Sequence, residues 1–128
     1  MKINHNNYLQ LAYNQARINL GKTSNNPCVG CIVVKNNSVI SSGITSLQGR
    51  PHAEFNALKK DSNFENSNLY VTMEPCTHHG LTPPCTSLII KKGIKKVYYS
   101  FIDIDKRTSN KAKKILKKSN IQVYKKNI

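Results

Sequence analysis

The sequence has few acidic residues and no long apolar run. Its 128 residues include six Asp and Glu against twenty Lys and Arg, which gives a formal net charge of +14. No apolar stretch is long enough for a membrane span, and the polar start of the chain shows no signal-peptide pattern. We therefore expect a cytoplasmic protein that does not contact membranes. In that reducing compartment, paired cysteines are more often metal ligands or catalytic groups than disulfides.

Internal repeats, linkers and a dinucleotide fingerprint are also missing. A chain of this length can bury one core but not two, so we predict a single domain over residues 1–128. No G-x-G-x-x-G follows a predicted strand, so nothing in the sequence predicts a dinucleotide site.

The positive charge is concentrated in the last third of the chain. From Lys91 to Ile128 there are thirteen Lys and Arg against Asp103 and Asp105. Clustered cations are typical of nucleic-acid binding, but this segment lacks the interleaved aromatic residues on which single strands stack. We therefore attribute the lysine excess to compositional bias and do not predict a nucleic-acid partner.

Hydrophobic spacing divides the chain into alternating elements. The first half predicts a helix from His5 to Leu20, a hairpin of strands 28–34 and 39–44, and a helix that starts at or just after His52. The second half predicts strands 68–73, 95–102 and 121–125, with helices 85–92 and 109–119 between them. Strands joined by helical crossovers are parallel, so these elements predict an α/β fold with a mixed five-stranded sheet.

Residues 71–85, "VTMEPCTHHGLTPPC", carry the densest group of chemically active side chains. Cys76 follows a predicted strand, Cys85 opens a predicted helix, and His52 stands at the mouth of another. An imidazole and two thiolates supply three ligands for a tetrahedral zinc and leave the fourth position for water, as a catalytic zinc site requires.

Glu54 favours a catalytic role for such a site. It stands two positions after His52 in "HAE", where it could reach a metal-bound water as general acid and base. Zinc-dependent base deaminases use this logic, with H-x-E followed by P-C-x-x-C. Here "PC" is followed by a second cysteine after eight intervening residues rather than two.

Four blocks of the sequence together resemble a known family. The blocks "NPCVGCIVV", "HAEFNAL", "LYVTMEPCTHHGLTPPC" and "GIKKVYYSFIDID" are similar to the deaminase domain of the bifunctional riboflavin-biosynthesis deaminase/reductases, within the cytidine-deaminase-like superfamily. The resemblance covers nearly the whole chain and implies a three-layer α/β/α fold. It also implies deamination of a diaminopyrimidinone that carries a ribosylamino 5′-phosphate, with release of ammonia.

The resemblance assigns roles to particular residues. It implies that His52, Cys76 and Cys85 bind one Zn²⁺ per chain and that Glu54 moves protons. On the substrate side it implies five positions, which are Asn26, His78, Thr82, Asp103 and Asp105. The reductase domain found in many members is absent from this sequence, which implies a separate reductase polypeptide as a partner, and relatives commonly form homo-oligomers.

Some positions depart from the family pattern. Thr45 stands where the family often has histidine, and Leu81 where it usually has a cation that would suit the substrate phosphate. These departures leave two alternatives open: a deaminase of tRNA or another nucleobase, or a non-catalytic zinc subunit that docks on a reductase.

The remaining cysteines and one glutamate have simpler interpretations. Cys28 and Cys31 could join Cys76 and Cys85 in a four-cysteine zinc site, but their apolar surroundings favour two buried strand residues. Glu74 is predicted to be a structural carboxylate that accepts backbone N–H bonds near the metal.

Overall fold

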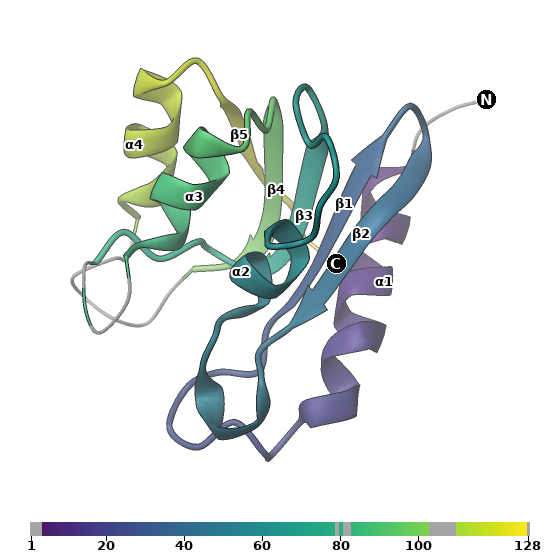
Figure 1. Cartoon of the computed structure of the whole chain (residues 1–128), viewed down its shortest axis with the longest axis vertical. Coiled ribbons are helices and arrows are strands. Elements are labelled where there is room, and N and C mark those ends of the chain that lie inside the picture. Colours follow the sequence, from purple (N-terminus) through teal and green to yellow (C-terminus); the bar gives the residue numbers. More distant parts are fainter. Residues whose placement is uncertain (1–3, 79, 81–82, 103–109, 128) are drawn as a thin grey trace.

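The computed structural model describes residues 4–78, 80, 83–102 and 110–127. It contains four α-helices and five strands within those residues, arranged as in Figure 1. The helices are α1 (His5–Ala16), α2 (Ala53–Leu58), α3 (Cys85–Lys91) and α4 (Ala112–Lys118). The strands are β1 (Gly30–Lys35), β2 (Ser38–Ile44), β3 (Asn68–Met73), β4 (Lys96–Phe101) and β5 (Gln122–Lys125). No helix in these described ranges is long and apolar enough to cross a membrane.

The five strands form one mixed sheet in the order β2-β1-β3-β4-β5. Strand β1 is antiparallel to both β2 and β3, whereas β3, β4 and β5 run parallel to one another. The hairpin turn between β1 and β2 uses Asn36 and Asn37, both with positive φ (52° and 63°), as tight hairpins require. The predicted mixed sheet is confirmed.

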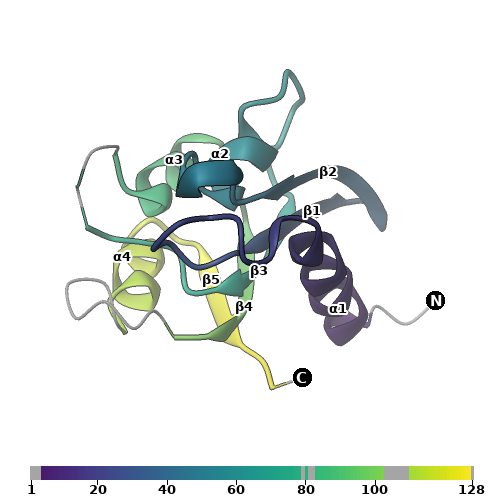
Figure 2. The same cartoon turned by 90° about the horizontal axis from the view of Figure 1, so that it is seen from below.

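Helices cover both faces of the sheet, as Figure 2 shows. Helix α1 packs on one face, where Leu9 and Ala12 contact Ile32 and Tyr70 in a buried cluster. Helices α2, α3 and α4 pack on the other face around a larger apolar core, to which Ala57, Ile89 and Leu116 contribute. Two helical layers enclose one sheet, which confirms the three-layer α/β/α prediction.

Alternation along the strands distributes the aromatic residues between these faces. Tyr70 and Tyr98 point toward α1 and stack with their ring centroids 4.7 Å apart. His5 of α1 covers them, since its ring stacks on Tyr98 and its Nδ1 lies 2.5 Å from the Tyr70 hydroxyl. Tyr99, the next residue along β4, is buried on the opposite face.

The first helix is shorter than predicted. The α-helix ends at Ala16, and a single 3₁₀ turn, Arg17–Asn19, follows it. Gly21, two residues later, has a φ of +81°. The Asn19 side chain donates to the carbonyl oxygen of Thr45 (2.9 Å). Just beyond the end of the helix, the chain is therefore held by a hydrogen bond to the residue after β2. Close approach of α1 to the sheet depends on Gly30, where a Cβ atom would lie 1.9 Å from the carbonyl oxygen of Ala12.

Candidate metal centre

Three elements converge at one end of the sheet and bring their first or last residues together. His52 is the N-terminal cap residue of α2, and Cys85 is the first residue of α3. Cys76 lies three residues beyond the end of β3. Pro84, with a φ of −61°, precedes α3 directly, at a position where its missing N–H is not needed.

The side chains of these residues form a compact group. The Nδ1 atom of His52 lies 3.6 Å from the Cys85 Sγ and 3.9 Å from the Cys76 Sγ. All three ligand atoms lie within 4.8 Å of one another. Zinc bonds of about 2.0–2.3 Å at tetrahedral angles place neighbouring ligand atoms about 3.6–3.8 Å apart. The donor set and its spacing therefore fit a tetrahedral zinc ion.

Hydrogen bonding shifts the pKa values of the two thiols in opposite directions. The backbone N–H of Cys85 donates to the Cys76 Sγ (3.1 Å). Side-chain hydrogen bonding from Cys85, followed by bonding from His52, lowers the pKa of Cys76 to about 4. The same pairing raises the pKa of Cys85, with burial adding to the effect. The pair thus carries one negative charge readily, and the second thiolate needs a cation beside it.

Glu54 lies in the first turn of α2 and is only 4% exposed. Burial is the main reason that its pKa rises, to about 7, and the Cys76 thiolate raises it further. Hydrogen bonding to Cys76 also raises the pKa of His52, with Glu54 contributing. A carboxylate with a pKa near neutrality can both accept and return a proton, which is the requirement for general acid and base catalysis.

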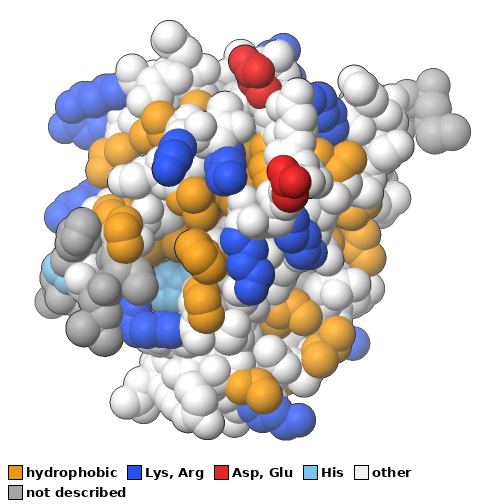
Figure 3. Space-filling model, viewed as in Figure 1, with side chains coloured by type: hydrophobic (Ala, Val, Ile, Leu, Met, Phe, Trp, Pro, Cys, Tyr) orange, Lys and Arg blue, Asp and Glu red, His pale blue; other side chains and the backbone are white. Residues whose placement is uncertain are grey.

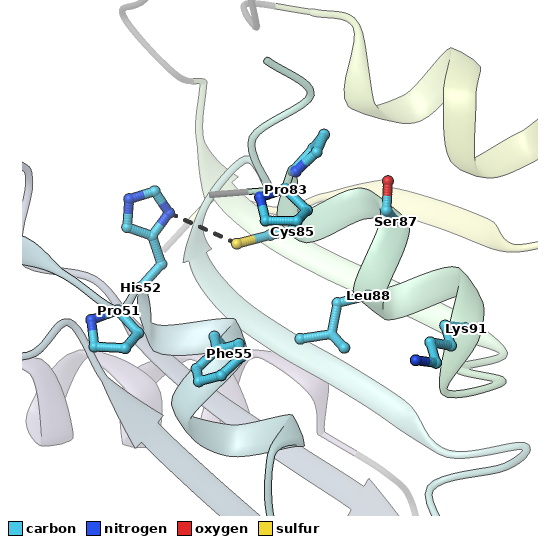
Figure 4. Close-up of a pocket in the computed structure, with 9 residues that line it drawn as sticks. Pro51, His52, Phe55, Pro83, Cys85, Ser87, Leu88 and Lys91 are labelled. Atoms are coloured by element: carbon cyan, nitrogen blue, oxygen red, sulfur yellow. Dashed lines mark hydrogen bonds between the residues drawn. The ribbon is translucent and has the colours of Figure 1, made fainter. Parts of the chain in front are cut away.

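An apolar pocket opens beside this group, between α2 and α3. Its volume is about 310 Å³, and His52 and Cys85 form one end of it (Figure 4). The remaining wall residues are mainly hydrophobic, and they are Pro51, Phe55, Pro83, Pro84, Ser87, Leu88 and Lys91. On the same side of the molecule, Figure 3 shows blue Lys and Arg side chains at many points and few red acidic ones.

The structure describes two of the five residues predicted to face the substrate. Asn26 is half-buried, and its Nδ2 donates to the carbonyl oxygen of Gly49 (2.8 Å), which fixes the orientation of the amide. His78 is also half-buried, two residues after Cys76. Thr82, Asp103 and Asp105 lie outside the described residues, as does Leu81.

The Thr45 side chain is buried and hydrogen-bonded, and it does not face an open pocket. It is 1% exposed, and its hydroxyl accepts a hydrogen bond from the backbone N–H of Val29 (2.9 Å). Its own backbone N–H donates to the Val29 carbonyl oxygen (3.0 Å). These two hydrogen bonds join Thr45, one residue after β2, to Val29, one residue before β1.

The other two cysteines are not members of the described group that could hold a metal. Cys31 is fully buried in β1, as predicted. The prediction for Cys28 was wrong: it precedes β1, is only half-buried, and its Sγ donates to the Ala16 carbonyl oxygen (2.9 Å). Within the described residues, the group that could hold a metal contains His52, Cys76 and Cys85 and neither of these cysteines.

Two residues that support the site were not identified from the sequence. Gly49 has a φ of +92°, and a Cβ atom there would lie 2.8 Å from Asn26 Nδ2, so the contact with Asn26 requires glycine. Asn56 of α2 donates from Nδ2 to the Ile44 carbonyl oxygen (2.7 Å) and to the Ser46 hydroxyl (2.8 Å). A glycine just upstream of "HAE" was the available signal for the first, and none pointed to the second.

Residues 2–101 match the family described as the cytidine and deoxycytidylate deaminase zinc-binding region. The chain belongs to this deaminase family. Together with the relatives described next, this match confirms the resemblance inferred from the four sequence blocks.

Relatives place the chain more closely within the family. It is 42% identical over 118 residues to the riboflavin biosynthesis protein RibD of Aquifex aeolicus, a match that covers 91% of this chain and 33% of that protein. It is 38% identical over 117 residues to the diaminohydroxyphosphoribosylamino-pyrimidine deaminase of Buchnera aphidicola from Schizaphis graminum, covering 91% of this chain and 80% of that one. Among solved structures, Acinetobacter baumannii RibD superposes with a TM-score of 0.88 at 36% identity, over 94% of this chain and 34% of that chain. The chain thus spans about a third of the RibD relatives and four-fifths of the Buchnera protein.

Proposed function

We propose that this protein catalyses the hydrolytic deamination of 2,5-diamino-6-ribosylamino-4(3H)-pyrimidinone 5′-phosphate in riboflavin biosynthesis. The products are 5-amino-6-ribosylaminouracil 5′-phosphate and ammonia. The observation that carries the proposal is the buried Glu54 carboxyl beside the His52, Cys76 and Cys85 group. The names of the Buchnera and Aquifex relatives support the substrate and the pathway.

One zinc ion per chain is proposed as the cofactor. His52 Nδ1 and the Sγ atoms of Cys76 and Cys85 would hold it, because their spacing fits tetrahedral coordination. When bound, zinc acts as a Lewis acid that lowers the pKa of a water ligand toward about 7. The N–H of Cys85 that bonds to the Cys76 Sγ orients this thiolate and limits its freedom to turn away.

Glu54 moves the protons of the reaction. Its carboxylate takes a proton from the attacking water, and the carboxylic acid then donates to the ring nitrogen next to the carbon under attack. A second transfer through Glu54 protonates the leaving amine, which departs as ammonia. A pKa of about 7 suits both directions, since neither the acid nor the base form is strongly favoured at neutral pH.

Polar groups around the centre would bind the rest of the substrate. The Nδ2 of Asn26 donates a hydrogen bond to the Gly49 carbonyl oxygen. Within the described residues, no donor bonds to the Oδ1 of Asn26, so we assign this oxygen to the pyrimidine. His78 and Thr82 are proposed for the same ring, and Asp103 and Asp105 for the ribose and phosphate side. Arg50 stands close enough to His52 for its charge to lower the pKa of the imidazole, and we assign it to the phosphate.

Ammonia release by the zinc-loaded protein tests this function, with Glu54→Gln as the paired variant. The variant is expected to keep one equivalent of zinc and to lose about 10³-fold in kcat, because it cannot carry the proton. Full turnover by Glu54→Gln would refute the proton-transfer role. A wild-type protein that binds zinc but releases no ammonia from this substrate would refute the assignment, and other aminated bases, including adenosine in tRNA, would be tested next.

A further inference from the structure

We propose that Asn56 is a positioning residue for substrate binding, because its side chain fixes the loop that orients Asn26 and carries Arg50. This inference rests on the proposed deamination, which assigns Asn26 and Arg50 to the substrate. Asn56 is the fourth residue of α2, and it lies four positions after His52. The loop, residues 45–51, connects the end of β2 to His52.

The Asn56 side chain bonds to both ends of this loop. Its Nδ2 donates to the carbonyl oxygen of Ile44, the last residue of β2 (2.7 Å), and to the Ser46 hydroxyl (2.8 Å). At the other end of the loop, the Pro51 carbonyl oxygen lies 3.4 Å from the same nitrogen. An amide nitrogen has two N–H groups, so the two shorter bonds use both of them and the Pro51 contact is shared. One side chain of α2 thus joins the entrance of the loop to its exit.

Hydrogen bonds within the loop transmit this constraint to Asn26. The backbone N–H of Ser46 donates to the Pro51 carbonyl oxygen (3.0 Å), and the N–H of Gly49 donates to the Ser46 carbonyl oxygen (2.9 Å). The Gly49 carbonyl oxygen then accepts from the Nδ2 of Asn26 (2.8 Å). A continuous series of contacts therefore leads from Asn56 through Ser46 and Gly49 to the amide of Asn26.

The loop also rests on the chain that precedes β1, beside which it lies in Figure 1. The backbone N–H of Gln48 donates to the Lys22 carbonyl oxygen (3.0 Å). Gly49 is buried, whereas Arg50, the next residue, is exposed. Because Gly49 and Pro51 are both held by hydrogen bonds, the position of the loop sets where the Arg50 side chain can reach.

Other contacts hold α2 itself against the sheet. A Cβ atom at Gly43 would lie 2.3 Å from the Ala53 carbonyl oxygen, so the first turn of α2 packs directly on β2. The Ser41 hydroxyl donates to the carbonyl oxygen of Ala57 (2.6 Å). Neither contact uses the Asn56 side chain. Loss of that side chain should therefore release the loop and leave the metal centre able to bind zinc.

The experiment compares the zinc-loaded wild type with two variants of Asn56. Asn56→Asp keeps the shape of the side chain and removes both N–H donors, and Asn56→Ala removes them without adding a charge. Asn7→Asp is the matched control, since Asn7 is an exposed asparagine of α1, on the opposite face of the sheet. Three quantities are measured: amide hydrogen exchange at Ser46 and Gly49, zinc per chain, and the KM and kcat for ammonia release.

In both Asn56 variants we expect exchange at Ser46 and Gly49 to accelerate by about tenfold or more. KM should rise by about tenfold, kcat should stay within about threefold, and zinc should remain at one equivalent. The changes should be larger in Asn56→Asp, because a carboxylate oxygen there would face the Ile44 carbonyl oxygen. Asn7→Asp should match the wild type in every measurement. Should Asn56→Asp fail to fold, Asn56→Ala decides the question alone.

Three outcomes would overturn the inference. Unchanged exchange at Ser46 and Gly49 would show that Asn56 does not hold the loop. Faster exchange with an unchanged KM would make Asn56 a purely structural residue. A joint fall in zinc content and kcat would show that Asn56 acts through His52 and not through the loop.

Failure of the proposed function gives a different result. If the wild type binds zinc and releases no ammonia, the proposed function and the role of Asn56 in substrate binding fail together. The exchange rates are measured without substrate, so they still decide whether Asn56 holds the loop.

Discussion

The two pairs of cysteines in this chain have opposite environments. Burial raises the pKa of Cys28, and it raises the pKa of the fully buried Cys31 well above its ordinary value. At the other pair, donors from Cys85 and His52 outweigh partial burial and lower the pKa of Cys76 to about 4. Hydrogen-bond donors therefore favour the thiolate form of Cys76, whereas burial favours the neutral thiol of Cys28 and Cys31.

Spacing along the chain does not decide this difference. Cys28 and Cys31 are three residues apart, but the extended chain turns successive side chains to opposite faces. Cys28 contacts the end of α1, whereas Cys31 packs in the core beneath α2, α3 and α4. Cys76 and Cys85 are nine residues apart, and the entrance to α3 brings them together.

Replacing a proposed ligand should produce the largest difference between the pairs. We expect His52→Ala and Cys85→Ser each to weaken zinc affinity by more than about 100-fold, beyond the range for groups that only support a ligand. Cys28→Ser should bind zinc as the wild type does. Competition with a chromogenic chelator measures all three affinities. Unchanged zinc affinity in Cys85→Ser would show that Cys85 does not bind zinc and that the two pairs of cysteines do not differ in this respect.

Replacing the buried cysteine should change stability instead. Cys31→Ser places a hydroxyl in the apolar core of the zinc-loaded protein, and we expect a loss of about 1–3 kcal/mol in the free energy of unfolding. Cys28→Ser should stay within about 0.5 kcal/mol, because the serine hydroxyl can donate to the Ala16 carbonyl oxygen as the thiol does. Urea unfolding followed by circular dichroism gives both values. Equal losses in the two variants would mean that their surroundings differ less than the structure indicates.

The smallest effect is a difference in alkylation rates between Cys76 and Cys28 after zinc has been removed. A group with a lowered pKa is already ionised above it, so the rate at Cys76 should be nearly constant from about pH 6 to pH 8. Cys28 has a raised pKa, so its thiolate fraction and its rate should keep rising across that range. Iodoacetamide labelling with peptide mass spectrometry resolves the two sites. A steep rise with pH at Cys76 would contradict its lowered pKa.

Much of the fold followed from local patterns in the sequence. Strand β3 and the N-terminal boundaries of α2 and α3 lie where the apolar runs and the prolines predicted them. The mixed sheet followed as well, because hairpin and crossover connections admit few arrangements. The end of α1 was predicted too late, since a helix-compatible sequence continues beyond Ala16 and the bond from Asn19 to Thr45 is not visible in it.

The sequence also predicted the residues of the candidate site. The sequence predicted His52, Glu54, Cys76 and Cys85 as the site, and the structure brings the side chains of His52, Cys76 and Cys85 together. The sequence alone also determined the strand and helix types, the family and the excess of positive charge, since these depend on residue type and near spacing.

Only the tertiary structure decided that Gly49 orients Asn26, that Cys28 lies outside its strand, and that Glu74 reaches Asn110 and Ala112. These contacts join residues that are 12 to 38 positions apart. Such residues come together only when the chain packs into its tertiary structure, so a pattern of neighbouring residues in the sequence does not predict these contacts.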